Sequence, residues 1–183
     1  MRLLLALVLA LLVVPASAGA SATQVMTFEA PRELLDDSRR DAALDEIKAF
    51  GVDRVRVLVY WERYAPEPDA RTKPAFDAAD PEAYPAGTWD LLDRLFDAAS
   101  VRGMTVQPTI TGPGPRWGTK ARKDRLTEPD AAEFGRFAAA VGRRYGSEVS
   151  TWSIWNEPNH PKFLQPQYRK GRPASPRIYR KLF

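Results

Sequence analysis

The chain alternates short runs of β-branched residues with segments of helical periodicity, and this alternation constrains the fold more than any other feature. The run 54–60 reads RVRVLVY and predicts a strand. The segment 89–102 repeats its apolar residues at helical spacing and predicts a helix. The same reasoning predicts strands at 24–28, 54–60, 105–111 and 149–155, and helices at 38–50, 89–102, 129–145 and from 175 onward. Strands that alternate with helices form βαβ units and a parallel sheet.

The connecting segments differ in length according to the element that they follow. Each helix ends near a glycine, at Gly51, Gly103 or Gly146, and the next strand follows at once. The strands lead instead into long segments at 61–88 and 112–126, and loops of that length inside a domain are often functional. We therefore expect the functional site at the carboxyl ends of the strands.

Two local signals predict finer details. Pro108 lies inside the strand 105–111 and has no N–H, so we expect a bulge or an early end of that strand. The stretch 127–130 reads Thr-Glu-Pro-Asp and resembles a capping box with proline in the first turn of the helix.

Residues 1–20 have the layout of a secretory signal peptide, with Arg2 before an apolar run at 3–14 and small residues after Pro15. The run is shorter than the about 20 residues that span a bilayer, which favours cleavage over an uncleaved anchor. The sequence contains no cysteine, so no disulfide stabilises it. We expect a secreted or extracytoplasmic protein with one domain at 21–183 and no membrane contact after cleavage.

The charge pattern excludes some classes of partner. The net charge is +4, but the basic residues lie among acidic neighbours, apart from 116–125 and 169–181. A nucleic-acid surface combines a basic patch with interleaved aromatic residues, and these two segments read as solvated loops instead. His160 is the only histidine and stands in a proline-rich loop, so we expect neither a catalytic triad nor a metal site, and no cofactor.

Aromatic and polar residues gather at the predicted strand ends. The strand 54–60 leads to Trp61, the loop after 105–111 carries Trp117, and the strand 149–155 leads to Asn156 and Glu157. Tryptophan rings stack on the C–H faces of sugars, while amide and carboxylate groups bind the hydroxyls. This combination favours a carbohydrate site.

The stretch 155–158, Trp-Asn-Glu-Pro at a strand end, resembles the Asn-Glu-Pro signature of clan A glycoside hydrolases. The motifs GVDRVRVLVYW at 51–61 and ITGPGPRW at 110–117 resemble the second and third strands of cellulase-type, family five-like members. The resemblance implies an α/β fold, the (β/α)8 TIM barrel, of which this chain would supply about the first four βα units. It also implies a carbohydrate substrate, a β-linked glycan or glycoside.

The resemblance assigns roles to individual residues. Glu157 matches the general acid/base, and Asn156 matches the residue that binds the sugar 2-hydroxyl. Arg56 matches an arginine that supports the charge of the nucleophile. Trp117 and Trp61 are candidate sugar platforms by position only.

Structural interpretations of the same residues stay open. Glu157 could cap the following turn, and the amide before it could only shape that turn. Arg56 could pair with Asp53 or Glu62 on the surface, and each tryptophan could belong to the core. Glu29, at the end of the first strand, could line the site or cap a turn.

A retaining glycosidase holds two carboxylates about 5 to 5.5 Å apart. The resemblance implies a nucleophilic glutamate after the seventh strand, and no acid of this sequence matches it. A complete barrel typically takes ~250 residues, and this sequence has 183. We therefore expect an N-terminal half that carries the acid/base without the nucleophile and is inactive alone. The alternatives are a non-catalytic carbohydrate-binding or degenerate barrel, and a half-barrel that assembles with a second chain.

Overall fold

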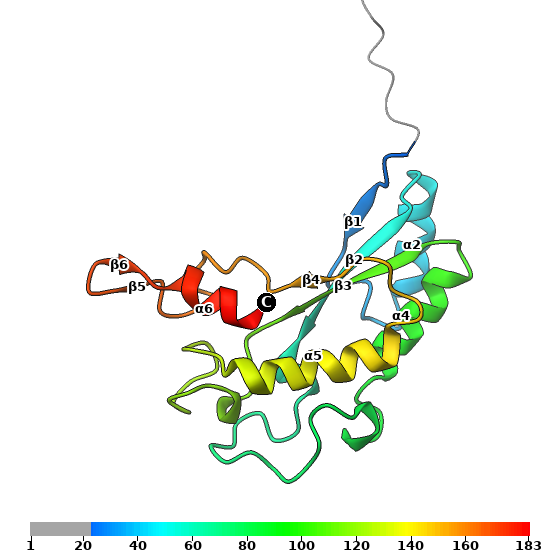
Figure 1. Cartoon of the computed structure of the whole chain (residues 1–183). Coiled ribbons are helices and arrows are strands. Elements are labelled where there is room, and N and C mark those ends of the chain that lie inside the picture. Colours follow the sequence, from blue (N-terminus) through cyan, green and yellow to red (C-terminus); the bar gives the residue numbers. More distant parts are fainter. Residues whose placement is uncertain (1–22) are drawn as a thin grey trace, which may run out of the picture.

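The computed structural model describes residues 23–183, and the proposed signal peptide lies outside this range (Figure 1). The elements are β1 (Thr27–Glu29), α2 (Arg40–Ala49), β2 (Arg54–Tyr60), α3 (Trp61–Tyr64), α4 (Asp90–Ser100), β3 (Thr105–Thr111), α5 (Ala131–Tyr145), β4 (Ser153–Ile154), β5 (Tyr168–Arg169), β6 (Arg172–Pro173) and α6 (Ser175–Leu182). Short 3-10 turns lie at Pro81–Ala83 and Arg116–Gly118. None of the helices in the described range has the length and apolar character that crossing a membrane requires.

Strands β1 to β4 form one parallel sheet in the order of the sequence. β2 and β3 pair from end to end, and β1 places Glu29 directly opposite Arg56. The predicted bounds of the two central strands agree with the observed ones. The predicted parallel sheet of alternating βα units is thereby confirmed.

Pro108 neither bulges nor ends β3, contrary to the expectation. It is buried and lies opposite Val57 in an unbroken ladder with β2. β3 pairs with β4 only at Thr109 and Ile110. The β4 side of Pro108 therefore has no ladder partner that would need its missing N–H.

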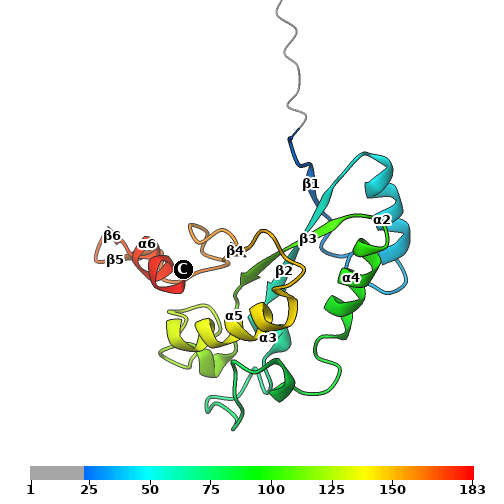
Figure 2. The same ribbon diagram turned by 45° about the vertical axis from the view of Figure 1, so that its right-hand side comes forward.

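Helices α2, α4 and α5 cover one face of the sheet (Figure 2). This follows from the strand order, because right-handed crossovers between consecutive parallel strands all place their helices on the same side. The core between the two layers contains Val55, Val57 and Val59 of β2, Leu92, Leu95 and Phe96 of α4, and Phe134, Phe137 and Val141 of α5. The opposite face of β2 presents the alternate residues, including Arg56, which places them on the side away from the helices.

The start of α5 differs from the predicted capping box. The N-cap is Asp130, whose side chain accepts hydrogen bonds from the backbone N–H groups of Ala132 and Glu133 at 3.0 and 3.1 Å. Pro129 therefore precedes the helix. An aspartate next to the first apolar turn satisfies two unpaired donors by itself, so the threonine at 127 is not needed as a cap.

The last part of the chain is less regular than predicted. β4 has two residues instead of the expected seven, because β3 is its only neighbour in the described sheet and the backbone turns at Trp155. β5 and β6 form a two-stranded antiparallel hairpin that the sequence did not predict. α6 begins at Ser175, as predicted, with Pro176 in its first turn and Ala174 as its N-cap.

The long segment after α3 is packed rather than loose. Tyr64 stacks on Trp89, with ring centroids 5.1 Å apart, and Tyr84 lies 5.0 Å from the same ring. The hydroxyl of Tyr84 donates to the carbonyl oxygen of Ala78 at 2.8 Å. These contacts hold the segment against α5 through Phe137.

Candidate active site at the strand ends

Arg56 lies at the centre of the polar face of the sheet. Its guanidinium forms an ion pair with Glu29, donates from Nε to Oγ1 of Thr109 at 2.8 Å, and donates from Nη2 to Oδ1 of Asn156 at 3.0 Å. The side chains of Arg56 and Glu29 are 28% and 30% exposed, so the pair is only partly screened by water. One cation thereby joins β1, β2, β3 and the end of β4.

This network decides two questions that the sequence left open. Arg56 pairs with Glu29, not with Asp53 or Glu62, and Glu29 lines the site instead of capping a turn. Asp53 accepts from the backbone N–H of Met26, at the opposite end of the strands. The register explains the choice, since parallel pairing sets Glu29 and Arg56 side by side.

Asn156 is positioned by its backbone as well as by Arg56. Its N–H donates to Oγ1 of Thr111 at 3.0 Å, and the N–H of Trp155 donates to the carbonyl oxygen of Ile110 at 2.8 Å. The two residues that flank Asn156 have positive φ, 65° at Trp155 and 42° at Glu157. Non-glycine residues with left-handed backbone angles are strained, and such strain is concentrated at functional sites.

The carboxylate of Glu157 is exposed and makes no hydrogen bond or ion pair with any residue of the described range. Only its backbone oxygen is engaged, accepting from the N–H of His160 at 2.9 Å. The side chain therefore does not cap the turn, which was the structural alternative for this residue. The chain presents an unpaired acid beside an amide that is held in place.

Trp61 and Trp117 do not serve as sugar platforms in this structure, which corrects the expectation for both. They are 1% and 3% exposed, and their rings meet edge to face at 5.8 Å. Trp61 also packs on Phe134 and Phe137 of α5, and Nε1 of Trp117 donates to the carbonyl oxygen of Pro66 at 3.1 Å. Both ring faces are covered by protein, so neither can stack on a ligand.

The glycines of the loop after β3 account for this burial. A Cβ atom on Gly114 or Gly118 would lie 2.5 Å from the ring of Trp61. Glycine therefore lets the loop close over the indole. The glycines of the GPGPRWG pattern carried part of this signal, because glycine permits close backbone approach as well as a turn, but the pattern did not indicate that the ring approached is that of Trp61.

Tyr60 and a second ion-pair network border the site, and the sequence assigned no role to either. Burial raises the pKa of Tyr60, whose ring lies 4.8 Å from the guanidinium of Arg63. Beyond it, Arg125 joins Glu62 at 2.9 Å and also pairs with Asp69. A cavity of about 460 Å³ lies beside this network.

The remaining predicted features are less informative. His160 accepts the N–H of Lys162 at its Nδ1, at 3.2 Å, and its ring lies 5.8 Å from that of Phe163. Within the described part of the chain, no three His, Cys, Asp or Glu side chains are grouped as a metal ion would require. The site thus consists of one unpaired carboxylate, one amide and one arginine network.

No protein-family model and no curated protein matches this chain. Solved structures do match in fold. A β-glucosidase from Exiguobacterium marinum is 15% identical with a TM-score of 0.55, over 86% of this chain and 42% of that one. The β-glucosidase from Trichoderma harzianum is 18% identical with a TM-score of 0.54, over 81% and 31%. The β-glycosidase from Thermosphaera aggregans is 19% identical with a TM-score of 0.50, over 78% and 37%.

At sequence identities of 15 to 19%, these structural matches show a shared fold and nothing further. The parallel βα units of this chain are arranged as part of a (β/α)8 barrel, as the sequence predicted. The chain spans 31 to 42% of the length of these three structures. In barrels of this kind the active site is built at the carboxyl ends of the strands, where Asn156 and Glu157 lie and which the guanidinium of Arg56 reaches.

Proposed function

We propose that this chain carries the acid/base part of a retaining β-glycosidase active site. The observation that carries the proposal is Glu157, an exposed and unpaired carboxylate at the carboxyl end of β4, next to an amide fixed by Arg56. A carboxyl group in this position protonates the glycosidic oxygen as the leaving group departs and then activates water. The substrate class is a β-linked glycan or glycoside, as in cellulase-type enzymes.

Asn156 and Arg56 have supporting roles in this proposal. Oδ1 of Asn156 accepts from Arg56, which leaves its amide N–H₂ free to donate to a sugar hydroxyl. Hydrogen bonds to the 2-hydroxyl strengthen in the transition state and contribute several kcal/mol. The guanidinium of Arg56 also supplies a fixed positive charge, which would support the charge of a nucleophilic carboxylate that attacks the sugar.

We propose that the nucleophile lies outside the described residues. The acids that β1 and β2 bring to the strand ends, Glu29 and Glu62, are held in ion pairs with Arg56 and Arg125. Glu29 already occupies the guanidinium of Arg56, and neither acid stands after a seventh strand, where the resemblance places the nucleophile. This leaves a C-terminal half of the barrel, in the same or in a second chain, as the source of the second carboxylate.

A non-catalytic carbohydrate-binding barrel is the second candidate. It is favoured by the ion pairs of Glu29 with Arg56 and of Glu62 with Arg125, because they leave Glu157 without a free second carboxylate from these strands. Such a protein would use Asn156 and Glu157 to bind hydroxyls without cleaving a bond. We also propose that the protein acts outside the cytoplasm, on the strength of the signal-like segment at 1–20. Both candidates act on extracellular carbohydrate and need no cofactor.

Leaving-group dependence tests the proposal. In the form of the protein that supplies both carboxylates, Glu157→Gln is expected to abolish most hydrolysis of alkyl β-glycosides, because a poor leaving group needs the proton. Release of a nitrophenolate should be affected far less in the first step. Equal losses on both substrates would exclude an acid role, and unchanged activity on both would favour the binding protein.

A further inference from the structure

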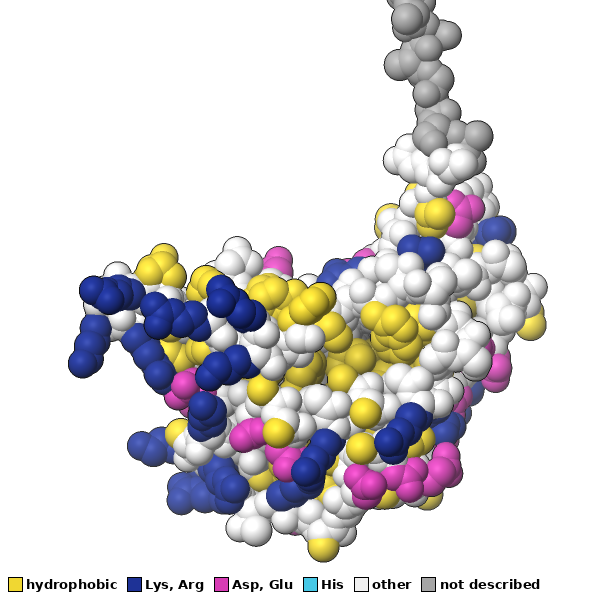
Figure 3. Space-filling model, viewed as in Figure 1, with side chains coloured by type: hydrophobic (Ala, Val, Ile, Leu, Met, Phe, Trp, Pro, Cys, Tyr) yellow, Lys and Arg dark blue, Asp and Glu magenta, His cyan; other side chains and the backbone are white. Residues whose placement is uncertain are grey.

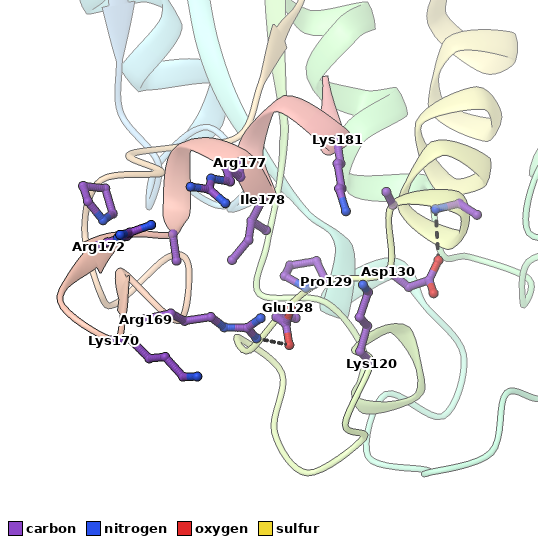
Figure 4. Close-up of a pocket in the computed structure, with 14 residues that line it drawn as sticks. Lys120, Glu128, Pro129, Asp130, Arg169, Lys170, Arg172, Arg177, Ile178 and Lys181 are labelled. Atoms are coloured by element: carbon purple, nitrogen blue, oxygen red, sulfur yellow. Dashed lines mark hydrogen bonds and ion pairs between the residues drawn. The ribbon is translucent and has the colours of Figure 1, made fainter.

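A basic cavity lies at the same end of the sheet as the proposed active site, among the segments that follow β3 and β4. Its volume is about 970 Å³, within the range of ligand pockets and large enough for an oligosaccharide. Its walls come from the loop after β3, the β5–β6 hairpin, the first turn of α5, and α6. Figure 4 shows these elements around the cavity, and Figure 3 shows Lys and Arg side chains gathered over α6 and the β5–β6 hairpin.

The cavity carries an excess of positive charge. Six cations line it, and two acids accompany them. Both acids are engaged, because Glu128 pairs with Arg169 and Asp130 caps α5. The other five cations are exposed and have no ion pair in the described range, namely Lys120, Lys170, Arg172, Arg177 and Lys181.

Two of these cations occupy electrostatically unfavourable positions. Arg172 lies directly opposite Arg169 in the hairpin, and like charges in that position destabilise a strand pair. Arg177 lies in the first turn of α6, where the positive end of the helix dipole repels a cation. A bound anion would remove both penalties.

Hydrogen bonds link the chain next to the cavity to the loop after Glu157. Nε2 of Gln167 donates to the carbonyl oxygen of Pro158, the residue after Glu157, at 3.0 Å. Oε1 of Gln167 accepts from the hydroxyl of Ser175, at the start of α6, at 3.0 Å. The start of α6, next to the lining residue Ala174, is therefore tied to the loop that follows Glu157.

The lining also contains an apolar part. It is formed by Pro129, Ala131, Ala132, Pro173, Ala174 and Ile178. In Figure 4, Ile178 extends from α6 toward the loop that carries Glu128 and Pro129. Apolar surface next to cations fits a ligand with C–H faces and negative charges, which is the chemistry of an anionic sugar.

We propose that this cavity binds the anionic sugar units of an oligosaccharide, with Arg172 and Arg177 as the main contacts for their charged groups. The proposal rests on the proposed function, because it assigns these units to the same oligosaccharide whose glycosidic bond Glu157 would protonate. Carboxylated and sulfated sugars share the required chemistry, and guanidinium groups bind both with paired hydrogen bonds.

Calorimetric titration of the full chain tests the proposal at about 0.15 M salt, where weak long-range attraction is screened. The ligands are a β-1,4-linked glucose tetrasaccharide, the same tetrasaccharide oxidised to carboxylates at C6, the same sulfated at C6, and a DNA duplex. We expect at least one charged tetrasaccharide to bind about tenfold more tightly than the neutral one, as a few exposed charge contacts would give.

Matched variants locate the contact. Arg172→Gln with Arg177→Gln should remove the preference for the charged tetrasaccharide, while Arg172→Lys with Arg177→Lys should keep most of it. Arg32→Gln with Lys48→Gln removes the same charge from exposed residues outside the cavity and should change nothing. Circular dichroism would check that each variant is folded.

Equal binding of neutral and charged tetrasaccharides would overturn the inference, as would an equal loss in the control variant or equally tight binding of DNA. Failure of the proposed function gives a different result. In that case the charged tetrasaccharide binds through Arg172 and Arg177, but hydrolysis does not depend on Glu157. If the preference is absent and hydrolysis depends on Glu157, only the cavity inference fails.

Discussion

Arg56 donates a hydrogen bond of 3.0 Å from Nη2 to Oδ1 of Asn156, a residue 100 positions further along the chain. The same guanidinium pairs with Glu29 on the neighbouring strand. The amide that would contact the substrate is thus held by a side chain from the other half of the sheet. Disturbing Arg56 should affect both stability and the geometry beside Glu157.

A double-mutant cycle measures this coupling. Arg56→Met should lower the free energy of unfolding by about 1 to 3 kcal/mol, because Glu29 is left partly buried without its cation. Combined with Asn156→Ala, the cycle should show an interaction energy of about 0.5 to 2 kcal/mol. Urea unfolding of the four proteins gives the values.

Arg54→Met provides the matched control for that cycle. Arg54 lies on the same strand, but within residues 23–183 its guanidinium has one hydrogen bond, to Oγ1 of Thr105 at 3.3 Å. Its interaction energy with Asn156→Ala should be close to zero. An equal coupling for Arg54 and Arg56 would mean that the cycle reports general destabilisation and not the hydrogen bond.

Asp93 connects α4 to α5 and should make stability depend on pH. Its carboxylate accepts from Nε and Nη2 of Arg144 at 2.9 and 2.5 Å and from the hydroxyl of Tyr145 at 2.6 Å. Burial alone raises the pKa of Asp93, but the hydrogen bonds from Arg144 and Tyr145 outweigh it, and the pKa is lowered from its usual value of 3.8.

A pKa that is lower in the folded state means that the ionised carboxylate contributes stability above the unfolded value and loses it as the pH falls through the folded value. Asp93→Asn should therefore cost about 1 to 3 kcal/mol of unfolding free energy at pH 7, and the difference should shrink at pH 3. Asp97→Asn, on the exposed side of α4, should have little effect at either pH. A difference that is independent of pH would contradict the linkage.

Gly118 should not tolerate a side chain. Its Cβ would lie 2.5 Å from Cη2 of Trp61, so Gly118→Ala forces the indole or the loop to move and should cost about 1 to 3 kcal/mol. Gly135→Ala is the control, because nothing lies within 4 Å of its Cβ in the exposed part of α5. That change should stabilise the protein by about 0.5 to 1 kcal/mol. Thermal unfolding of both variants measures these changes. A neutral Gly118→Ala would contradict the close packing of this loop on Trp61.

The sequence predicted the bounds of the buried central strands better than those of the edge strand β4. β2 and β3 match their predicted bounds because their β-branched and apolar residues fit a buried central position. β4 was overpredicted, since the residues from Val149 to Trp152 include the β-branched and aromatic types that favour a strand but have no pairing partner in the described sheet. The pattern of a single segment does not report whether a neighbour is present.

The site shows a similar division. The motif placed Asn156 and Glu157 at a strand end, and the structure brings the strand-two Arg56 to the same place. The aromatic residues were misread, because composition does not reveal which way an indole points. Trp61 turns into the core at the start of α3, where it meets Phe134 and Phe137. The link between Glu29 and Arg56 depends on strand register, which a single sequence leaves open.

The central claim is that Glu157 faces the glycosidic bond of a bound sugar. A β-glycosylamine with an N-bromoacetyl group tests it without requiring the nucleophile, because a carboxylate beside the glycosidic nitrogen displaces bromide and remains attached as an ester. Peptide mass mapping of the full chain then identifies the labelled residue. Glu148 serves as an internal reference, since it is exposed and lies before β4, at the amino end of that strand.

We predict that Glu157 is labelled much faster than Glu148, that an unreactive β-glycoside slows this labelling, and that Glu157→Gln abolishes it. Labelling at equal rates on both glutamates, with no protection by the competing glycoside, would contradict the assignment of Glu157 to a sugar site.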